Sequence, residues 1–477
     1  MALTQSFSGI RGIYGEDFTL DVVRKYVLVY LDYLKKSSKK NNLKIVVGED
    51  TRHSSYEIKK EIIKILDCDI INVGISSTPM VQLAVRHYKA DGGIIITASH
   101  NPKEYNGFKF LGKDGAVLRP KDIAQVIAAF NEAGKDEKLL KKINKNISKH
   151  HSEFSKKIID KKEDIREAYA EFCLKLLGKK NIDAIKKSGI SILLDPNGGT
   201  GFIIEKVLDR LKINYSMHNR KLGVFNRAIE PNNASLHYLK GQVIRENYSL
   251  AAGFDCDADR VEIIDNEGGI VSGQYVLALI TDLFGIDKKL KGKTIVTNDA
   301  TSGIVKEIAE KYKAKTSEVE VGEINVVDSM QKCKSPLGGE GSSSGAIIPP
   351  SKCRDGILAV LFIMALIARK KKTLSKILDT YPVYHTLREN IGFEPENHDE
   401  IKRSIENYYK NKKLKLAKTG GITGGLKVFF TKDSFLWFRA SKTEGASFRI
   451  MADSKNKAMA EKMLEEGAAL VNGFNDS

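Results

Sequence analysis

The 477-residue chain lacks any long apolar stretch. Its longest uninterrupted apolar run, Ile357–Ala368, has twelve residues, whereas a helix needs about 20 to span a bilayer. Residues 1–15 also lack the basic segment followed by an apolar stretch that marks a secretory signal. We therefore expect no membrane partner and a cytoplasmic protein.

Cysteine is scarce as well. The five cysteines lie far apart and form no C-x-x-C pair, which argues against a disulfide framework and against a zinc site. Apolar residues make up 42% and charged residues 29% of the chain, a composition typical of folded rather than disordered proteins. At roughly 150 residues per domain, the length predicts three or more domains.

Acidic residues are fewer than basic ones, and the formal net charge is +17. Such an excess fits nucleic acid, an anionic membrane or a phosphorylated substrate. The lysines occur in short patches among apolar helix positions, and the single tryptophan, Trp437, offers little surface on which bases could stack. We therefore expect no nucleic-acid partner and a solvated, lysine-rich surface.

The residue pattern predicts three similar mixed-sheet α/β domains and a smaller C-terminal α+β domain. In the first 380 residues, short apolar runs that end in glycine or polar residues alternate with segments of helical period. The expected strands are 44–47, 93–97, 190–194, 250–254 and 294–297, and the expected helices are 20–34, one opening near 164, and 357–368. Beyond Pro382 we expect a helix over 400–409, strands over 426–430, 435–439 and 447–451, and a closing helix from 455. The predicted domains are 1–155, 156–268, 269–378 and 379–477.

Two polar segments follow expected strands, which is where α/β proteins place their sites. The strand over 93–97 stops at Ser99-His100-Asn101-Pro102, a segment that would also suit an ordinary turn. The strand over 250–254 is followed by three alternating carboxylates, Asp255, Asp257 and Asp259. Such oxygen ligands suit Mg²⁺. An exposed acidic turn is the alternative, but like charges this close repel one another unless a cation or an arginine offsets them.

Two further segments offer polar side chains to a ligand. Residues 338–345 place one acid, Glu340, among glycines and serines. They fit either a polyhydroxylated ligand or a surface linker. Residues 439–444 alternate Arg439, Ser441 and Thr443, which offers a guanidinium and two hydroxyls to a phosphate. Ordinary strand alternation explains the same pattern.

In this combination and order, the four segments resemble the α-D-phosphohexomutase superfamily of phosphomannomutase/phosphoglucomutase and phosphoglucosamine mutase type. T-A-S-H-N-P-x-x-Y-N-G-x-K at 97–109 resembles its phosphoserine loop, and D-x-D-A-D-R at 255–260 resembles its metal loop. G-E-x-S at 339–342 resembles its sugar loop, and R-x-S-x-T-E at 439–444 resembles its phosphate loop. Segments 8–12, 48–52, 321–322 and 353–356 add weaker similarities.

The resemblance implies a phosphoryl exchange between phosphorylated Ser99 and a hexose 1- or 6-phosphate, through a bound bisphosphate. It implies that Mg²⁺ binds at Ser99 and the three aspartates, and that hexose 1,6-bisphosphate, such as glucose 1,6-bisphosphate, is the activator. The implied catalytic residues are Ser99, Arg11 and Arg260 for charge stabilisation, and Lys109 for proton transfer, with His100 as the second candidate. The implied substrate-binding residues are Glu340, Ser342, Arg439, Ser441 and Thr443, and the resemblance implies that the four domains surround a central active-site cleft. The implied partners are small hexose phosphates, and the expected assembly is a monomer or homodimer.

The chain departs from the superfamily pattern at positions that bear on specificity. Cys256 replaces the glycine that is usual in the metal loop, and Gly445 replaces the proline that often follows Thr-Glu in the phosphate loop. Ser6-Phe7 replaces the Gly-Thr that usually precedes Ser-Gly near the start of the chain. The serine-rich sugar loop lacks the histidine found in several bacterial members. A phosphomannomutase/phosphoglucomutase is the main hypothesis, with a phosphoglucosamine mutase as the alternative and a non-catalytic sugar-phosphate-binding protein as a more distant one. The sugar and phosphate loops argue against a phosphatase with an aspartate nucleophile.

Overall fold

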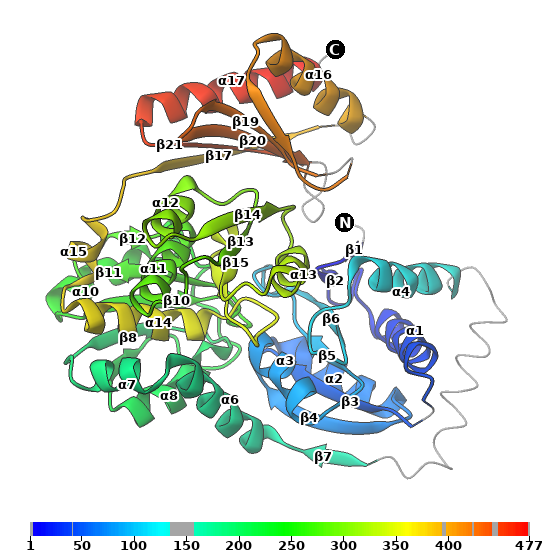
Figure 1. Ribbon diagram of the computed structural model, residues 1–477. Helices are drawn as coiled ribbons and strands as arrows, with labels where there is room; N and C mark the ends of the chain where they lie inside the picture. The colour runs from blue at the N-terminus through cyan, green and yellow to red at the C-terminus, as the bar shows by residue number, and fades with distance from the viewer. Residues whose placement is uncertain are drawn as a thin grey trace. The chain divides into compact units, whose positions relative to one another are not determined.

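The computed structural model describes residues 3–40, 42–133, 157–393, 397–421, 424–440 and 447–475 (Figure 1). The chain divides into two compact units. The first comprises Met1–Ile270 with Pro350–Lys371, and the second comprises Val271–Pro349 with Lys372–Ser477. In the part of the chain that is described, no helix is both long and apolar enough to cross a membrane.

A seven-stranded mixed sheet forms the N-terminal part of the first unit. Its order is β1-β2-β6-β5-β3-β4-β7. β3, β4, β5 and β7 run parallel, whereas β6, β2 and β1 pair antiparallel at one side. The strands are β1 (Thr4–Ser6), β2 (Gly9–Ile13), β3 (Lys44–Glu49), β4 (Asp69–Ile75), β5 (Gly92–Ile96), β6 (Tyr105–Gly112) and β7 (Ile158–Asp160), and the helices are α1 (Leu20–Ser38), α2 (His53–Ile65), α3 (Thr78–His87) and α4 (Pro120–Ala133).

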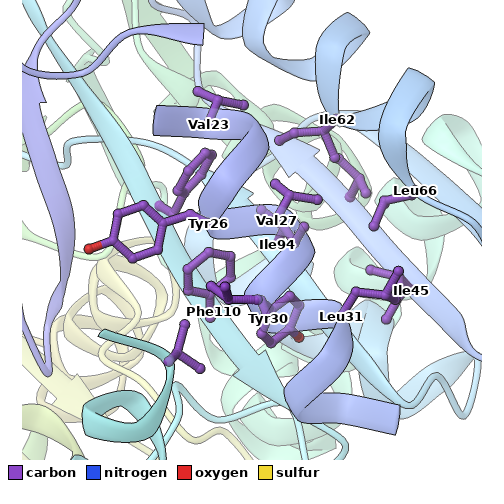
Figure 2. Packing of buried hydrophobic residues seen from close by; sticks show 14 of the residues in the cluster. Val23, Tyr26, Val27, Tyr30, Leu31, Ile45, Ile62, Leu66, Ile94 and Phe110 are labelled. Carbon is purple, nitrogen blue, oxygen red and sulfur yellow. The ribbon is translucent and has the colours of Figure 1, made fainter. Parts of the chain in front are cut away.

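Helix α1 illustrates how the sequence sets this packing. Thr19 caps its N-terminus by accepting a hydrogen bond from the backbone N–H of Val22. The buried residues recur at helical spacing and face the sheet, where Tyr30 packs close to Phe110 of β6 (Figure 2). Gly92 of β5 permits this contact, because a Cβ atom there would lie 2.4 Å from the Tyr30 hydroxyl.

The second sheet of the first unit has the order β12-β11-β10-β8-β9. Its strands are β8 (Ser191–Asp195), β9 (Asn214–Met217), β10 (Leu250–Phe254), β11 (Val261–Asp265) and β12 (Ile270–Val271). The helices here are α6 (Lys162–Leu177), α7 (Lys179–Lys186), α8 (Glu205–Leu211), α9 (Asn233–Leu236), α10 (Lys240–Arg245) and α14 (Gly356–Lys370), with 3-10 turns at Thr200–Ile204 and His237–Leu239. The twelve-residue apolar run lies in α14, which is buried on all sides and packs against α6, α7 and β11.

The second unit contains a four-stranded and a five-stranded sheet. The first has the order β14-β13-β15-β16 and the second is the antiparallel β17-β21-β20-β19-β18. Their strands are β13 (Thr294–Asn298), β14 (Lys315–Val319), β15 (Gly338–Glu340), β16 (Gly345–Ile347), β17 (His385–Gly392), β18 (Lys415–Lys418), β19 (Leu426–Thr431), β20 (Ser434–Ala440) and β21 (Ser447–Ser454). The helices are α11 (Gly273–Ile286), α12 (Gly303–Lys311), α13 (Glu323–Cys333), α15 (Leu374–Leu378), α16 (His398–Asn411) and α17 (Lys457–Asn475), with a 3-10 turn at Gly341–Ser343.

These elements confirm the predicted fold class of mixed α/β sheets followed by a C-terminal α+β domain. Every strand and helix expected by residue range is present, most with ends within two or three residues of the prediction. Residues 350–371, which we assigned to the third domain, lie in the first compact unit. The domain limits at 268/269 and 378/379 stay predictions, and the limit at 155/156 falls outside the described residues.

Candidate active site

Ser99 lies in the loop between β5 and β6, in the first unit. Its side chain is buried, and its backbone has a left-handed φ of +51°, which a non-glycine residue rarely adopts. The Ser99 N–H donates to Thr97 Oγ1 at 2.8 Å, and the Ser99 hydroxyl donates to Asp255 Oδ2 at 2.9 Å. The structure thus brings the predicted phosphoserine position to the first residue of the predicted metal loop, 156 residues away.

Asp255, Asp257 and Asp259 follow β10 and are all buried. One carboxylate oxygen from each lies within 4.8 Å of the others. Asp257 Oδ1 and Asp259 Oδ1 are buried and accept no hydrogen bond, although such atoms are costly unless they are paired. A hard divalent cation such as Mg²⁺ would satisfy these oxygens, so the donor set fits the predicted metal.

The charges around the three aspartates differ. Burial raises the pKa of Asp255 well above its usual range, and the charges of Asp257 and Asp259 raise it further. Burial acts in the same direction on Asp259, but Lys109, Arg354 and Arg260 outweigh it and lower the pKa of that carboxyl. The loop therefore keeps a strong negative charge on the Asp259 side.

Lys109 of β6 points into the same cluster. Its Nζ lies 2.7 Å from Asp257 Oδ2 and 2.8 Å from Asp259 Oδ2, and it also donates to Thr78 Oγ1 at 3.2 Å. An ammonium group has three N–H donors, so each donor of Lys109 has an acceptor. The Lys109 ammonium therefore offsets part of the negative charge of Asp257 and Asp259.

Arg11, His100 and Arg260 complete the cluster. Arg11 Nη1 donates to Asn101 Oδ1 at 3.0 Å, and burial together with the charge of Arg260 lowers the pKa of Arg11 to about 10. Arg260 donates its backbone N–H to Asp255 and an Nη1–H to Glu230. His100 Nδ1 lies 3.5 Å from Ser99 Oγ, and its pKa falls well below the usual range because of burial and the two arginines. His100 is therefore neutral at neutral pH.

Sequence reasoning missed two residues of this cluster. Thr78, at the start of α3, donates its hydroxyl to Asp257 Oδ2 at 2.6 Å and its N–H to Asp257 O at 2.9 Å. Arg354 Nη2 lies 3.6 Å from Asp259 Oδ2. Arg354 belongs to the C-R-D-G segment, which we noted only as a weak similarity. No sequence pattern around Thr78 indicated a contact with Asp257, which lies 179 positions further along the chain.

The predicted sugar-binding residues lie in the second unit. Glu340 ends β15, is buried, and accepts hydrogen bonds at Oε1 from Asn298 Nδ2 and from the N–H of Gly322. Asn298 Nδ2 also donates to Ser342 Oγ at 2.8 Å. Asn298 ends β13, and no sequence pattern indicated that it orients both residues of the sugar loop.

The predicted phosphate-binding arginine lies near this loop. Arg439 of β20 donates from Nη2 to Glu320 Oε1 at 3.3 Å and to Val321 O at 3.5 Å. Burial lowers the pKa of Arg439, while Glu320 and Asp299 act in the opposite direction. Arg439 and Glu340 thus both contact the segment over 320–322. The remaining phosphate-loop candidates, Ser441 and Thr443, lie outside the described residues, as does Gly445.

Comparison with known proteins gives the same assignment along the chain. Models of the phosphoglucomutase/phosphomannomutase family match residues 4–137 as α/β/α domain I, 167–269 as domain II and 272–384 as domain III. The chain is 30% identical to the phosphoglucomutase/phosphomannomutase of Thermococcus kodakarensis, over 97% of each chain. It is 29% identical to a Pyrococcus abyssi protein named "Probable phosphoglucosamine mutase", over 97% of this chain and 96% of the other.

Solved structures share the fold over nearly the whole chain. A phosphoglucomutase/phosphomannomutase family protein of Burkholderia thailandensis superposes with a TM-score of 0.79 at 17% identity, over 99% of this chain and 98% of the other. The N-acetylphosphoglucosamine mutase of Aspergillus fumigatus, solved with GlcNAc-6P and magnesium, gives 0.61 at 15% identity, over 100% and 96%.

The fold and the matches define a phosphohexomutase, an isomerase that moves a phosphate group between two positions of a hexose. The chain belongs to the phosphoglucomutase/phosphomannomutase family.

Proposed function

We propose that this chain interconverts hexose 1-phosphate and hexose 6-phosphate by way of a phosphoserine at Ser99 and a hexose 1,6-bisphosphate, with glucose and mannose phosphates as its substrates. The observation that carries the proposal is the 2.9 Å contact between Ser99 Oγ and Asp255 in a buried cluster of three carboxylates and several cations. Phosphoryl transfer needs alignment and charge neutralisation more than covalent help from the protein, and these residues can supply both.

In the proposed reaction, the bond between phosphorus and Ser99 Oγ breaks while phosphorus bonds to the free hydroxyl oxygen of the hexose phosphate. The hydroxyl proton passes to a protein base. This first transfer leaves the bonding electron pair on Ser99 Oγ. The bisphosphate then reorients, and the phosphorus of its other phosphate bonds to Ser99 Oγ while the bond from that phosphorus to the sugar oxygen breaks. The base returns its proton to that sugar oxygen. Asp255, Asp257 and Asp259 would hold Mg²⁺, which would supply positive charge to the serine oxygen as the bond breaks. Arg11 and Arg260 add fixed cationic charge near the same atoms.

Two residues are candidates for moving the proton. The resemblance favours Lys109, but all three of its N–H donors contact acceptors here. The neutral imidazole of His100, 3.5 Å from Ser99 Oγ, has a nitrogen that can accept a proton. Comparing His100→Gln with Lys109→Gln separates them. Loss of the base lowers kcat steeply and removes the acidic limb of the kcat profile against pH.

The substrate is proposed to lie against Glu340 and Ser342 through its hydroxyls, and against Arg439, Ser441 and Thr443 through the phosphate that is not transferred. The ion pair between Arg439 and Glu320 shows that the guanidinium can hold an anionic oxygen. Hexose 1,6-bisphosphate is the proposed activator, since it can phosphorylate Ser99 directly. A cytoplasmic location and a monomer or homodimer remain predictions.

A phosphoglucosamine mutase is the second candidate, because the Pyrococcus abyssi relative with that name is nearly as similar as the Thermococcus kodakarensis one. A coupled assay on glucose 1-phosphate, mannose 1-phosphate and glucosamine 1-phosphate decides between them by the ratio of kcat/KM values.

Intact-mass spectrometry tests the proposal itself. After incubation with glucose 1,6-bisphosphate and Mg²⁺, we expect an added mass of ~80 Da, which corresponds to one phosphate on a hydroxyl, and peptide mapping should place it on Ser99. A chain with neither the added phosphate nor turnover of any of the three substrates would be the non-catalytic binding protein instead.

A further inference from the structure

Arg52 is an arginine with a fully buried side chain, and its guanidinium donates hydrogen bonds to the loop that carries Ser99. It lies between β3 and α2, at the end of the segment Gly48–Arg52. Arg52 Nη2 donates to Ser99 O at 2.9 Å and to Asn101 O at 2.7 Å. Arg52 Nη1 donates to Tyr105 O at 2.9 Å and to Pro102 O. One side chain thus binds three backbone carbonyls of the loop between β5 and β6 and the carbonyl of Tyr105, the first residue of β6.

The fifth donor of the guanidinium has an acceptor as well. Arg52 Nε donates to Asp50 Oδ2 at 3.1 Å, and the other oxygen of Asp50 accepts from the backbone N–H of Arg52 and from Ser55 Oγ. A guanidinium carries five N–H donors in a planar fork, and all five are used. Lysine, with three donors around one nitrogen, cannot reproduce this set.

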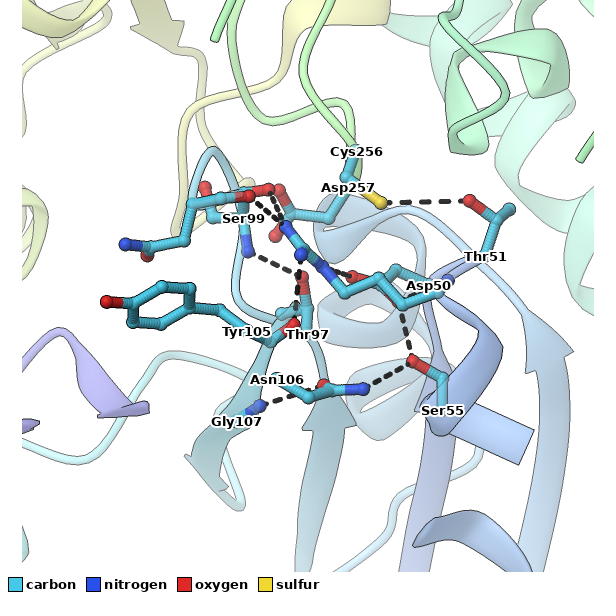
Figure 3. A network of polar contacts seen from close by, with 12 residues as sticks. Asp50, Thr51, Ser55, Thr97, Ser99, Tyr105, Asn106, Gly107, Cys256 and Asp257 are labelled. Carbon is cyan, nitrogen blue, oxygen red and sulfur yellow. Dashed lines mark hydrogen bonds and ion pairs between the residues drawn. The ribbon is translucent and has the colours of Figure 1, made fainter. Parts of the chain in front are cut away.

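The Asp50–Arg52 pair is anchored to both strands that flank the loop. The backbone N–H of Asp50 donates to Ile96 O, the last residue of β5. On the β6 side, Asn106 Nδ2 donates to Ser55 Oγ at 3.0 Å, and Asn106 Oδ1 accepts from the N–H of Gly107 (Figure 3). Hydrogen bonds to Asp50, Arg52 and Ser55 therefore hold the backbone of this loop at both ends and along its length.

The conformation of Ser99 explains why such a hold matters. A serine with φ near +51° is in a strained region that persists only when surrounding contacts fix it. Arg52 binds the carbonyl of Ser99, while Thr97 binds its N–H. Together they fix the direction in which the Ser99 hydroxyl leaves the backbone, toward Asp255 Oδ2.

We propose that Arg52, oriented by Asp50, is a positioning residue for phosphoryl transfer: it fixes the backbone of residues 99–105 so that the oxygen of Ser99 is aligned with the carboxylate cluster. This rests on the proposed function of Ser99. Arg52 touches neither the reacting oxygen nor the three aspartates in the contacts described, so its effect passes through the loop. A displacement of about 1 Å at the reacting atoms is worth on the order of 100-fold in rate.

The test compares Arg52→Lys with Arg24→Lys, a matched exchange on α1 whose ion pair with Glu61 is remote from the loop. For Arg52→Lys we expect kcat to fall about 100-fold with KM within threefold of the parent, and Arg24→Lys to match the parent. Asp50→Asn is the second variant, because its amide would face Arg52 Nε with a donor. It should lower kcat in the same way but less. Unchanged kcat in Arg52→Lys, or a fall in kcat that matches the loss of folded protein, would overturn the proposal.

Hydrogen–deuterium exchange supplies a readout that does not depend on activity. In Arg52→Lys, we expect faster exchange in peptides covering 97–106 and unchanged exchange in the peptides of β8 and β10. Faster exchange throughout the first unit would make Arg52 a general stability residue and contradict the proposal. If the parent proves inactive on all hexose phosphates, the proposed function fails, and the exchange data still decide whether Arg52 holds the loop.

Discussion

The contacts of Ser99 are hydrogen bonds that orient its hydroxyl rather than apolar packing in the core. Its hydroxyl donates to Asp255, and His100 Nδ1 lies 3.5 Å from it. Its backbone is held in a left-handed conformation by neighbours on both sides. Strain of this kind tends to occur at functional sites. The side chain contributes one hydrogen bond to stability and, in the proposed reaction, the oxygen that carries the phosphate.

The first prediction is that Ser99→Ala abolishes turnover and leaves the fold intact. Without the hydroxyl no phosphoserine forms, whereas the loop keeps its backbone contacts to Arg52. Activity is measured in the coupled assay and stability by thermal unfolding, with Ser37→Ala on α1 as the control. A Ser99→Ala enzyme within tenfold of the parent activity would show that another group carries the phosphate.

The second prediction concerns Asp257, one of the two aspartates of the carboxylate cluster with a buried oxygen that accepts no hydrogen bond. Asp257→Asn removes charge and ligand strength, so we expect loss of Mg²⁺ dependence and of most activity. In the parent, millimolar Mg²⁺ should also raise the melting temperature, because an ion that binds only the folded state stabilises it. Asp160→Asn on the exposed strand β7 is the control.

Two observations would count against this metal site. One is a parent enzyme whose activity survives EDTA, and the other is a melting temperature that does not respond to Mg²⁺.

At the scale of elements, helix α14 links the core to the site. All residues from Gly356 to Ala368 are buried, and Asp355 caps its N-terminus by accepting the N–H of Leu358 at 2.9 Å. Arg354, one residue earlier, reaches Asp259. Asp355 also accepts a hydrogen bond from the Tyr169 hydroxyl of α6. The buried helix α14 thus begins at a titratable carboxyl, Asp355, and the residue before it, Arg354, contacts Asp259 of the carboxylate cluster.

The third prediction follows from the pKa of Asp355, which burial raises to about 6, against about 3.9 in an unfolded chain. Between these values the folded state keeps a proton that the unfolded state has lost. Stability therefore falls as pH rises from about 4 to 6, by up to about 3 kcal/mol for this group. The contribution is constant below that window and fully lost above it.

Asp355→Asn tests the sign of this effect. Asparagine keeps an acceptor for Leu358 and Tyr169 but cannot ionise, so its melting temperature in metal-free buffer, relative to that of the parent, should rise with pH between 4 and 6. Other titrating groups are common to both proteins and cancel in the difference. Parallel stability profiles for parent and variant would rule out Asp355 as the group responsible.

At the scale of the whole molecule, the proposed site residues are divided between the two compact units. Ser99, Lys109 and the aspartates belong to the first unit, whereas Glu340, Ser342 and Arg439 belong to the second. The proposed function requires that both sets contact one substrate. We therefore expect hexose phosphate to favour a closed form that also excludes water.

The fourth prediction is that Arg439→Ala raises KM strongly, since it removes a charge-assisted contact to phosphate worth about 1.5 to 3 kcal/mol. Phosphorylation of Ser99 by hexose 1,6-bisphosphate should persist at higher ligand concentration. Arg403→Ala, an exposed exchange on α16, is the control. An Arg439→Ala variant with the parent KM but lower stability would make Arg439 a structural residue, paired with Glu320 for packing alone.

Small-angle scattering tests closure independently of that arginine. The radius of gyration should fall when the parent is saturated with hexose phosphate. Identical dimensions with and without the ligand would contradict domain closure and leave the predicted phosphate contact untouched.

The sequence by itself determined the elements and the chemistry of the loops. Strands such as β10 were predictable because apolar residues run up to a polar loop, and α14 because twelve apolar residues are too short for a membrane and long enough for a core helix. The three alternating aspartates indicated a metal site, and the resemblance of four short motifs to the superfamily implied a phosphoryl carrier at Ser99. These signals are local, since each depends on residues a few positions apart, and the family matches agree with them.

Only the tertiary structure decided which loops meet and which residues serve them. The contacts of Arg52 with four carbonyls, of Thr78 with Asp257 and of Asn298 with Glu340 join segments far apart in the chain, and no local pattern encodes them. The depressed pKa of His100 and the raised pKa of Asp355 likewise arise from burial and from charges on other elements. A sequence states which groups are present, whereas their distances and desolvation, which govern their chemistry, exist only once the chain has folded.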